Sequence, residues 1–237
     1  MNGSGSISNS NGSLTVGITG TVVVGHAPAD HVVFDLDGTL VDSAAGILAA
    51  LRRVLANRSV EARVPIDESL IGPPLRHVLQ LASGMDDDRR LEELETEFRE
   101  VYDAETHRDT VAYPGVNEAL QRLTRRGASL HIATNKRGLP TDKILGLMGW
   151  DGLFQSVYCA DSVRSGKTGK ASTLAELVRA ERIDASRAVF VGDSADDAEA
   201  ASLVGMDFVA VTWGYGSRLL LERFPNVPRV SGPADLR

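Results

Sequence analysis

The 237-residue sequence lacks the features that mark secreted and membrane proteins. Its one cysteine, Cys159, excludes a disulfide within the chain, so a reducing, cytoplasmic location is the expectation. No apolar stretch reaches the ~20 residues that span a bilayer. The first residues, MNGSGSISNSNGS, have neither the basic nor the apolar region of a signal peptide. We therefore predict no membrane partner.

The sequence also lacks an excess of positive charge, since its net charge is −7. A general nucleic-acid binder needs a basic surface, so we predict no nucleic-acid partner. A small anionic substrate remains compatible, because local charge and a bound metal can outweigh the net value. With 43% hydrophobic and 24% charged residues, the composition is that of an ordinary globular protein with room for one core and a smaller appendage.

Several familiar motifs are incomplete or absent. The SGKT segment lacks the first glycine of a nucleotide-binding P-loop, because position 161 is aspartate. The five histidines show no metal-ligand spacing. Cys159 falls in a predicted strand, which favours a place in the core over a catalytic role.

The order of the predicted elements indicates an α/β fold. The apolar run HVVF at 31–34 predicts a buried strand. Apolar residues at helical spacing follow, and after the turn AYPGV at 112–116 helices and strands alternate. This alternation predicts a doubly wound parallel sheet, Rossmann-like, with an all-helical insertion after its first strand.

These patterns set the expected domain boundaries. Residues 31–43 and 113–237 are predicted to form the core, and residues 44–112 an inserted helical cap domain. Residues 1–30 are expected to form a flexible arm, within which the segment 14–25 reads either as a small hairpin or as irregular chain.

Polar residues follow several of the predicted strands. Ligands of open parallel sheets bind beyond the carboxyl ends of the strands, so these residues are expected to meet at one edge of the sheet. They are Asp35 and Asp37, then Thr134 and Asn135, then Lys167 and Lys170 in a loop, and finally Asp193, Asp196 and Asp197.

Several carboxylates at one edge would repel each other strongly in a poorly solvated site. A divalent cation relieves that repulsion, and hard oxygen ligands suit Mg²⁺, which proteins hold with one or two carboxylates and substrate phosphate. A lysine and a hydroxyl nearby suit phosphoryl oxygens. The sequence thus favours a magnesium site for a phosphate ester.

At these residues the chain resembles the haloacid dehalogenase-like (HAD) superfamily. Its four motifs are similar to DLDGTL, ATN, a downstream lysine and GDSADD, in this order. The segments DGTLVDS, IGPPL, YPGV and TWGYG resemble the phosphoglycolate phosphatase-like branch, which carries a helical cap. The resemblance covers about residues 31–237.

The resemblance implies a role for each carboxylate. Asp35 would be the nucleophile that forms an aspartyl-phosphate, and Asp37 the acid that protonates the leaving alkoxide and later the base for water. Residues two apart in an extended chain point the same way, so both can face one substrate. The implied metal site uses Asp35, Asp37 through its backbone carbonyl, and Asp193, with Asp197 orienting either the metal's water or the lysine.

The remaining implied residues bind the phosphoryl group. Thr134 and the amide of Asn135 would hold its oxygens. Lys170 opens a predicted helix, as the family's lysine does, whereas Lys167 lies three residues earlier in a glycine-containing loop. We favour Lys170 and keep Lys167 as the alternative, because neither is followed by the proline that the family often has.

We therefore predict a magnesium-dependent phosphatase that acts on a small phosphate monoester as a monomer or homodimer. The resemblance suggests phosphoglycolate first, and a phosphorylated acid or sugar in general. The alternatives are a carbon dehalogenase, which would not need Asp37, a sugar-phosphate mutase, and a non-enzymatic binding module. Arg76 and His77 either contact the leaving group or lie on a solvated helix face.

Overall fold

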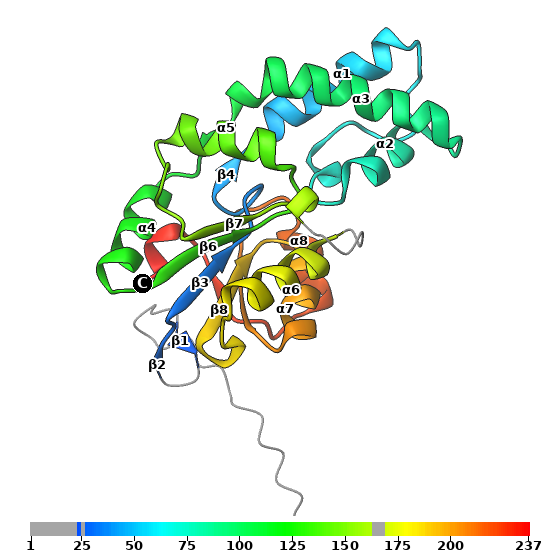
Figure 1. Cartoon of the computed structure of the whole chain (residues 1–237). Coiled ribbons are helices and arrows are strands. Elements are labelled where there is room, and N and C mark those ends of the chain that lie inside the picture. Colours follow the sequence, from blue (N-terminus) through cyan, green and yellow to red (C-terminus); the bar gives the residue numbers. More distant parts are fainter. Residues whose placement is uncertain (1–22, 25–26, 163–168) are drawn as a thin grey trace, which may run out of the picture.

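The structure, a computed structural model, describes residues 23–24, 27–162 and 169–237 (Figure 1). It has a parallel sheet with helices on both faces and a helical block at one end of the sheet. The predicted fold class is therefore confirmed. Among the described helices, none has the length and apolar character needed to cross a membrane.

All neighbouring strands of the six-stranded sheet run parallel. The central strand is the predicted first strand, and its residues Val32 and Val33 are both buried. Its apolar run does not alternate with polar residues, because helices cover both faces of the sheet. The strand order across the sheet is β10 (Arg229–Val230), β9 (Asp207–Val211), β8 (Ala188–Gly192), β3 (His31–Phe34), β6 (Ser129–Ala133) and β7 (Ser156–Tyr158).

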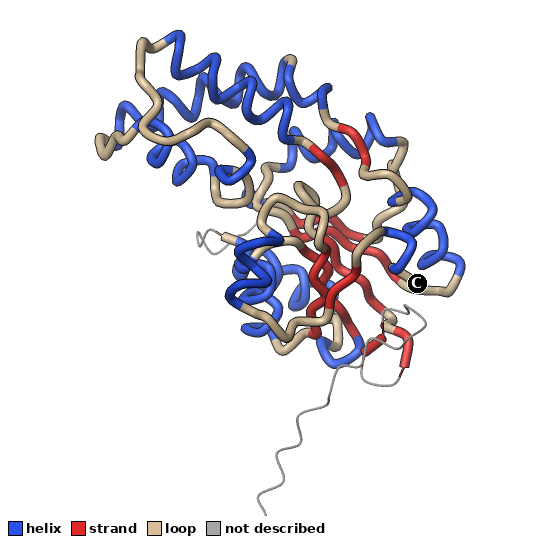
Figure 2. Tube along the Cα trace, turned by 180° about the vertical axis from the view of Figure 1, so that it is seen from behind, coloured by secondary structure: helices blue, strands red, loops and turns tan. Residues whose placement is uncertain are grey.

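Two layers of helices bury the two faces of the sheet (Figure 2). On one face, Val32 packs in a hydrophobic cluster with α4 (Val116–Arg125) and α5 (Gly138–Met148). On the other face, Val33 belongs to the cluster formed with three further helices. These are α6 (Lys170–Glu181), α7 (Ala195–Val204) and α8 (Ser217–Arg223).

The inserted block is helical and has a hydrophobic cluster of its own. The chain enters it after β4 (Val41–Asp42) and leaves it into β5 (Val111–Ala112), which pair antiparallel. This separate cluster favours the predicted division into core and cap domains, whose boundaries stay a prediction, and we call the block the cap below. Its helices are α1 (Ala44–Asn57), α2 (Leu75–Ser83) and α3 (Asp88–Ala104).

The first turn of α1 is capped by Asp42 and not by the adjacent Ser43. Asp42 accepts a hydrogen bond from the backbone N–H of Ala44 at 3.1 Å, whereas Ser43 makes no side-chain cap and donates instead to Asp37. Tyr215, from the TWGYG segment, reaches the same turn, where its hydroxyl accepts from the backbone N–H of Ser43 at 2.8 Å. The carboxyl-terminal part of the chain therefore fixes the entry to the cap.

The shortest elements went unpredicted. Two-residue strands such as β4, β5 and β10 are too short to show a hydrophobic period. The described part of the chain also has short 3₁₀ helices, which are η1 (Glu68–Leu70), η2 (Thr106–Asp109), η3 (Ala160–Ser162), η4 (Ala185–Arg187) and η5 (Pro233–Asp235).

Most of the predicted arm, residues 1–30, lies outside the described residues, as does most of the possible hairpin at 14–25. Its described part contains β1 (Val23–Val24) and β2 (Ala27–Pro28), which pair antiparallel. Whether the rest of the arm is flexible stays a prediction.

Two histidines on the neighbouring strands β3 and β6 contact each other. His131 is fully buried, and its ring nitrogens lie 3.1 Å from His31 and 2.8 Å from the hydroxyl of Ser156. Burial, together with the charge of His31, lowers the pKa of His131 to about 4. The folded protein therefore holds this ring neutral at pH values where an unfolded chain binds a proton.

We expect His131 to make folding stability pH-dependent. As pH falls from about 6.5 towards 4, only the unfolded chain gains this proton, so stability falls by about 2 kcal/mol between pH 7 and 4.5 on this account. His131→Gln should reduce the loss by that amount in denaturant unfolding, compared with wild type. The exposed His77→Gln is the control; an unchanged pH dependence in His131→Gln would contradict the assignment.

Candidate active site

The nucleophile predicted at Asp35 lies directly beyond the end of β3 and is buried, with 6% of its surface exposed. Its carboxylate forms an ion pair with Lys170, which also contacts Asp197 at 3.0 Å. Burial raises the pKa of Asp35 well above its ordinary value, although the charge of Lys170 opposes that rise. The positive charge of Lys170 therefore does not fully offset the cost of burying the ionised carboxylate of Asp35.

Three buried carboxylates form a cluster that fits a metal ion. Each of Asp35, Asp193 and Asp197 offers an oxygen, and these oxygens lie within 4.8 Å of one another. Lys170 forms ion pairs with Asp35 and Asp197, so two negative charges remain in excess if all three carboxylates are ionised. Burial, followed by the charge of Asp197, raises the pKa of Asp193 to about 7. A divalent cation would remove this excess, so the residues fit the predicted metal.

Glycines allow the backbone to approach Asp193 closely. Gly38, in the DLDGTL segment, has φ of +85°, and a Cβ there would lie 2.6 Å from a carboxylate oxygen of Asp193. A Cβ at Gly214 would lie 2.3 Å from the Cβ of the same aspartate. The N–H of Gly216 donates to Asp193 at 2.9 Å. The DLDGTL and TWGYG segments thus enclose one carboxylate, which explains their glycines.

Asp197 lies behind the cluster at the start of α7. One of its oxygens contacts Lys170, and the other accepts from the N–H and the hydroxyl of Ser194 at 3.0 and 2.6 Å. Ser194 in turn caps the helix by accepting from the N–H of Asp197. Because one oxygen contacts Lys170 directly and the other is held by Ser194, the geometry favours the predicted role of orienting the lysine over that of orienting the metal's water.

Asp37 is held by the nearby Ser43 and by Lys136, which lies far away in the sequence. Its Oδ1 accepts from the hydroxyl of Ser43 at 2.5 Å and lies 3.1 Å from the ammonium of Lys136. Lys136 also donates to the hydroxyl of Tyr102, on the cap helix α3, at 3.0 Å. Burial alone would lower the pKa of Lys136, but Asp37 and Tyr102 outweigh it and raise the pKa. Lys136 therefore remains charged and links the predicted acid to the cap.

Lys136 was not predicted as a site residue from the sequence. The available signal was its position, directly after Asn135 at the carboxyl end of a strand. A lysine there is exposed in most proteins, whereas only 7% of this side chain is exposed, and Tyr102 of α3 contacts its ammonium.

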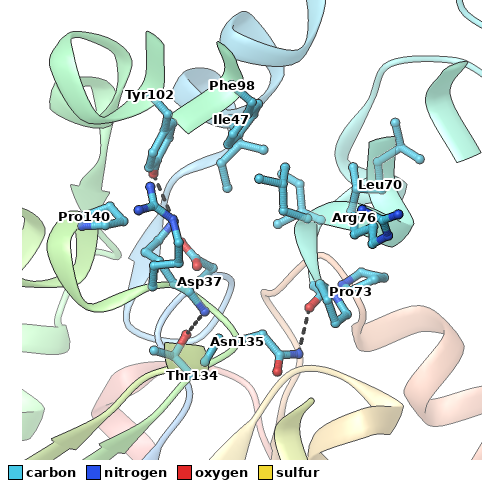
Figure 3. Close-up of a pocket in the computed structure, with 18 of the residues that line it drawn as sticks. Asp37, Ile47, Leu70, Pro73, Arg76, Phe98, Tyr102, Thr134, Asn135 and Pro140 are labelled. Atoms are coloured by element: carbon cyan, nitrogen blue, oxygen red, sulfur yellow. Dashed lines mark hydrogen bonds and ion pairs between the residues drawn. The ribbon is translucent and has the colours of Figure 1, made fainter. Parts of the chain in front are cut away.

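The predicted phosphoryl-binding residues follow β6. Thr134 is buried, and its hydroxyl oxygen accepts from the N–H of Lys136 at 3.1 Å, which leaves the hydroxyl proton free to donate to a ligand. Asn135 donates from its side chain to the carbonyl of Gly72 at 3.1 Å. Asn135 thus connects the core to the cap from the other side of the cleft (Figure 3).

Lys170 is the first residue of α6, and 4% of its side chain is exposed. Besides the two aspartates, its ammonium donates to the carbonyl of Ala133 at 3.3 Å. The alternative, Lys167, lies outside the described residues, so the choice between the two lysines stays a prediction.

A cleft of about 420 Å³ lies between core and cap, directly over these residues. Asp35, Asp37 and Lys170 line its floor, together with Thr134 and Asn135. Figure 3 shows Ile47, Phe98 and Tyr102 of the cap opposite Asp37. Tertiary structure therefore brings all seven predicted site residues together, five in the cleft and Asp193 and Asp197 beside Asp35.

The two open alternatives in the cap have different outcomes. Arg76 lines the cleft, where it pairs with Glu95 at 2.9 Å and also with Asp88. His77 is exposed and does not line the cleft.

Comparison with known proteins identifies relatives of this chain. Residues 32–211 match the family described as haloacid dehalogenase-like hydrolase. A phosphoglycolate phosphatase from Caulobacter vibrioides is 33% identical, over 84% of this chain and 89% of its own length. The tyrosine-protein kinase PtkA from Mycobacterium tuberculosis is also 33% identical, over 81% of this chain and 65% of its own length.

Among solved structures, a haloacid dehalogenase-like family hydrolase from Streptococcus pneumoniae superimposes with a TM-score of 0.77, over 87% of this chain and 96% of that one. At 23% identity this similarity shows the fold alone. The family match covers most of the chain and includes the four superfamily motifs, whereas the TWGYG segment at 212–216 lies just beyond its end. The chain belongs to the haloacid dehalogenase-like hydrolases, and within them it is a phosphoric monoester hydrolase.

Proposed function

We propose that this chain is a magnesium-dependent phosphatase that hydrolyses a small phosphate monoester through an aspartyl-phosphate on Asp35. One observation carries the proposal. Two carboxylates of different environment, Asp35 and Asp37, line one cleft, and Lys170 contacts only the first. A nucleophile and a separate acid need this arrangement.

In the first step, an oxygen of Asp35 attacks phosphorus and displaces the alkoxide, which takes a proton from Asp37. In the second step, Asp37 accepts a proton from water, which attacks the phosphorus of the aspartyl-phosphate and regenerates the Asp35 carboxylate. Ser43 and Lys136 hold Asp37 on one oxygen, so its other oxygen can exchange the proton. The hydroxyl of Thr134 and the ammonium of Lys170 donate hydrogen bonds to the phosphoryl oxygens. These bonds stabilise the negative charge that develops on those oxygens.

Magnesium would be held by Asp35, Asp193 and the carbonyl of Asp37, where it would neutralise charge on the phosphoryl oxygens. The buried, mutually repelling carboxylates support this choice. The cap covers the cleft and would exclude bulk water. The monomeric or homodimeric state and the cytoplasmic location stay predictions.

The first prediction concerns the nucleophile and the metal. A panel of phosphate esters should release phosphate with Mg²⁺ and lose that activity in excess EDTA. Asp35→Asn should lower kcat at least about 10⁴-fold, because an amide does not attack phosphorus. The exposed Asp151→Asn should retain activity. Activity of Asp35→Asn near that of Asp151→Asn, with both proteins folded, would remove Asp35 as nucleophile.

The second prediction decides between the two lysines. Lys170→Ala should lower kcat about 10²- to 10³-fold, since its ammonium contacts the nucleophile and phosphoryl charge develops beside it. Lys167→Ala should lower it much less. Steady-state kinetics of both variants, with circular dichroism to check folding, give the answer. A greater loss in Lys167→Ala would reverse the assignment.

The third prediction concerns Lys136 as a positioning residue. Lys136→Met keeps the length of the side chain but removes the charge beside Asp37, so kcat should fall about 10- to 100-fold while KM changes little. The pH profile of kcat should change with it, because the acid loses its neighbouring charge. Lys143→Met is the matched control. Lys143 lies on α5 and, like Lys136, bonds to the cap, where it donates to the carbonyl of Asp103 at 2.7 Å, but it does not contact Asp37. Equal kinetics in the two variants would show a merely structural role.

A further inference from the structure

The size of the cleft is set by direct contacts between cap and core. Asn135 bonds to the carbonyl of Gly72 on one side, and Lys136 bonds to Tyr102 on the other. Arg137 adds an ion pair with Asp103 at 2.6 Å. The cap is therefore in contact with the core, and about 420 Å³ of space remains above the carboxylates. Pockets of about 300–1,000 Å³ are typical of sites that enclose drug-sized ligands.

The cap wall of the cleft is mostly apolar. Ile47 and Phe98 face the floor from above, and Leu70 and Pro73 lie to one side (Figure 3). Side chains of this kind stabilise a leaving group by burying its apolar surface. The apolar lining residues contributed by the cap are Ile47, Leu51, Leu70, Ile71, Pro73, Pro74, Leu75, Val78 and Phe98.

The described basic residues that line the cleft are all paired with acids. Arg76 and Arg99 both bond to Glu95, at 2.9 and 2.6 Å, and Arg76 pairs in addition with Asp88. The other three basic residues belong to the core. Lys136 pairs with Asp37, Arg137 pairs with Asp103, and Lys170 pairs with both Asp35 and Asp197.

This pairing has a consequence for the substrate. A carboxylate on the leaving group would enter an apolar space in which the described cations already have acidic partners. Burying a charge without a partner is costly, so such a substrate would bind poorly. The two-carbon acid of phosphoglycolate would also leave most of the cleft empty.

From the volume, the apolar wall and the paired cations, and resting on the proposed phosphatase activity, we propose that the substrate is a phosphate monoester with an uncharged, largely apolar, ring-sized leaving group. Phosphoglycolate is then a poor substrate. The phosphoryl group lies on the floor, at Asp35, and the ring lies against Ile47 and Phe98.

The test compares primary alkyl esters, so that the leaving alkoxides are similar in reactivity. Benzyl phosphate should have a kcat/KM at least about tenfold above that of ethyl phosphate and of phosphoglycolate, because each group buried in an apolar pocket contributes roughly tenfold or more. Charge is tested separately from size: 4-methylbenzyl phosphate should exceed 4-carboxybenzyl phosphate by at least about tenfold.

Variants then locate the ring. Ile47→Trp, which narrows the cleft, should lower kcat/KM for benzyl phosphate at least about tenfold more than it lowers kcat/KM for ethyl phosphate. Leu75→Trp serves as a second lining variant should the first fold poorly. Leu81→Trp is the matched control, since Leu81 lies on the cap helix α2, is 43% exposed and does not line the cleft. It should change neither substrate.

The outcomes separate this inference from the proposed function. If phosphoglycolate or 4-carboxybenzyl phosphate is hydrolysed as well as its neutral partner, the inference is overturned and the phosphatase stands. Equal losses for benzyl and ethyl phosphate in a folded Ile47→Trp would also overturn it. If no ester is hydrolysed with Mg²⁺ present, the proposed function fails, and the inference fails with it.

Discussion

The arrangement of the core depends on the electrostatic cost of burying three carboxylates together. Asp35, Asp193 and Asp197 have oxygens within 4.8 Å of each other, and all three residues are buried, with Asp35 the most exposed at 6%. Lys170 compensates part of this charge, and its ammonium is buried with them. Such a cluster is destabilising unless a ligand completes it, so it is best understood as a site built for a cation and a phosphate.

The cap and the core are joined at the carboxylate that we propose as the acid. Lys136 contacts both Asp37 of the core and Tyr102 of the cap, so the charge beside the acid and the position of the cap are linked by one ammonium group. In the proposed reaction the core residues act on the phosphoryl group, which every phosphate ester shares. The cap contributes the wall that contacts the leaving group, and differences in that wall can change the substrate without altering the chemistry.

Much of the fold and most of the site could be predicted, for identifiable reasons. Asp35, Thr134 and Asp193 follow three strands whose apolar runs are evident, and parallel strands place their carboxyl ends at one edge of a sheet. Lys136 was not predicted, because a lysine in a loop after a strand is usually exposed and no local pattern reveals that α3 covers it. Likewise, α8 and β10 are too short for hydrophobic periodicity, and α8 takes its place by packing Leu220 against the sheet.

The sequence by itself determined the α/β fold class, the helical insertion and the carboxylates that gather at one edge of the sheet, because each is encoded in contiguous residues with a regular period or motif. Only the tertiary structure decided what faces those carboxylates. The cleft wall draws Ile47 from α1, Leu75 from α2 and Phe98 from α3, and the pairing of Arg76 and Arg99 depends on Glu95 lying between them. Contacts of this kind join residues far apart in the chain, and packing of whole helices, rather than any local spacing, brings them together.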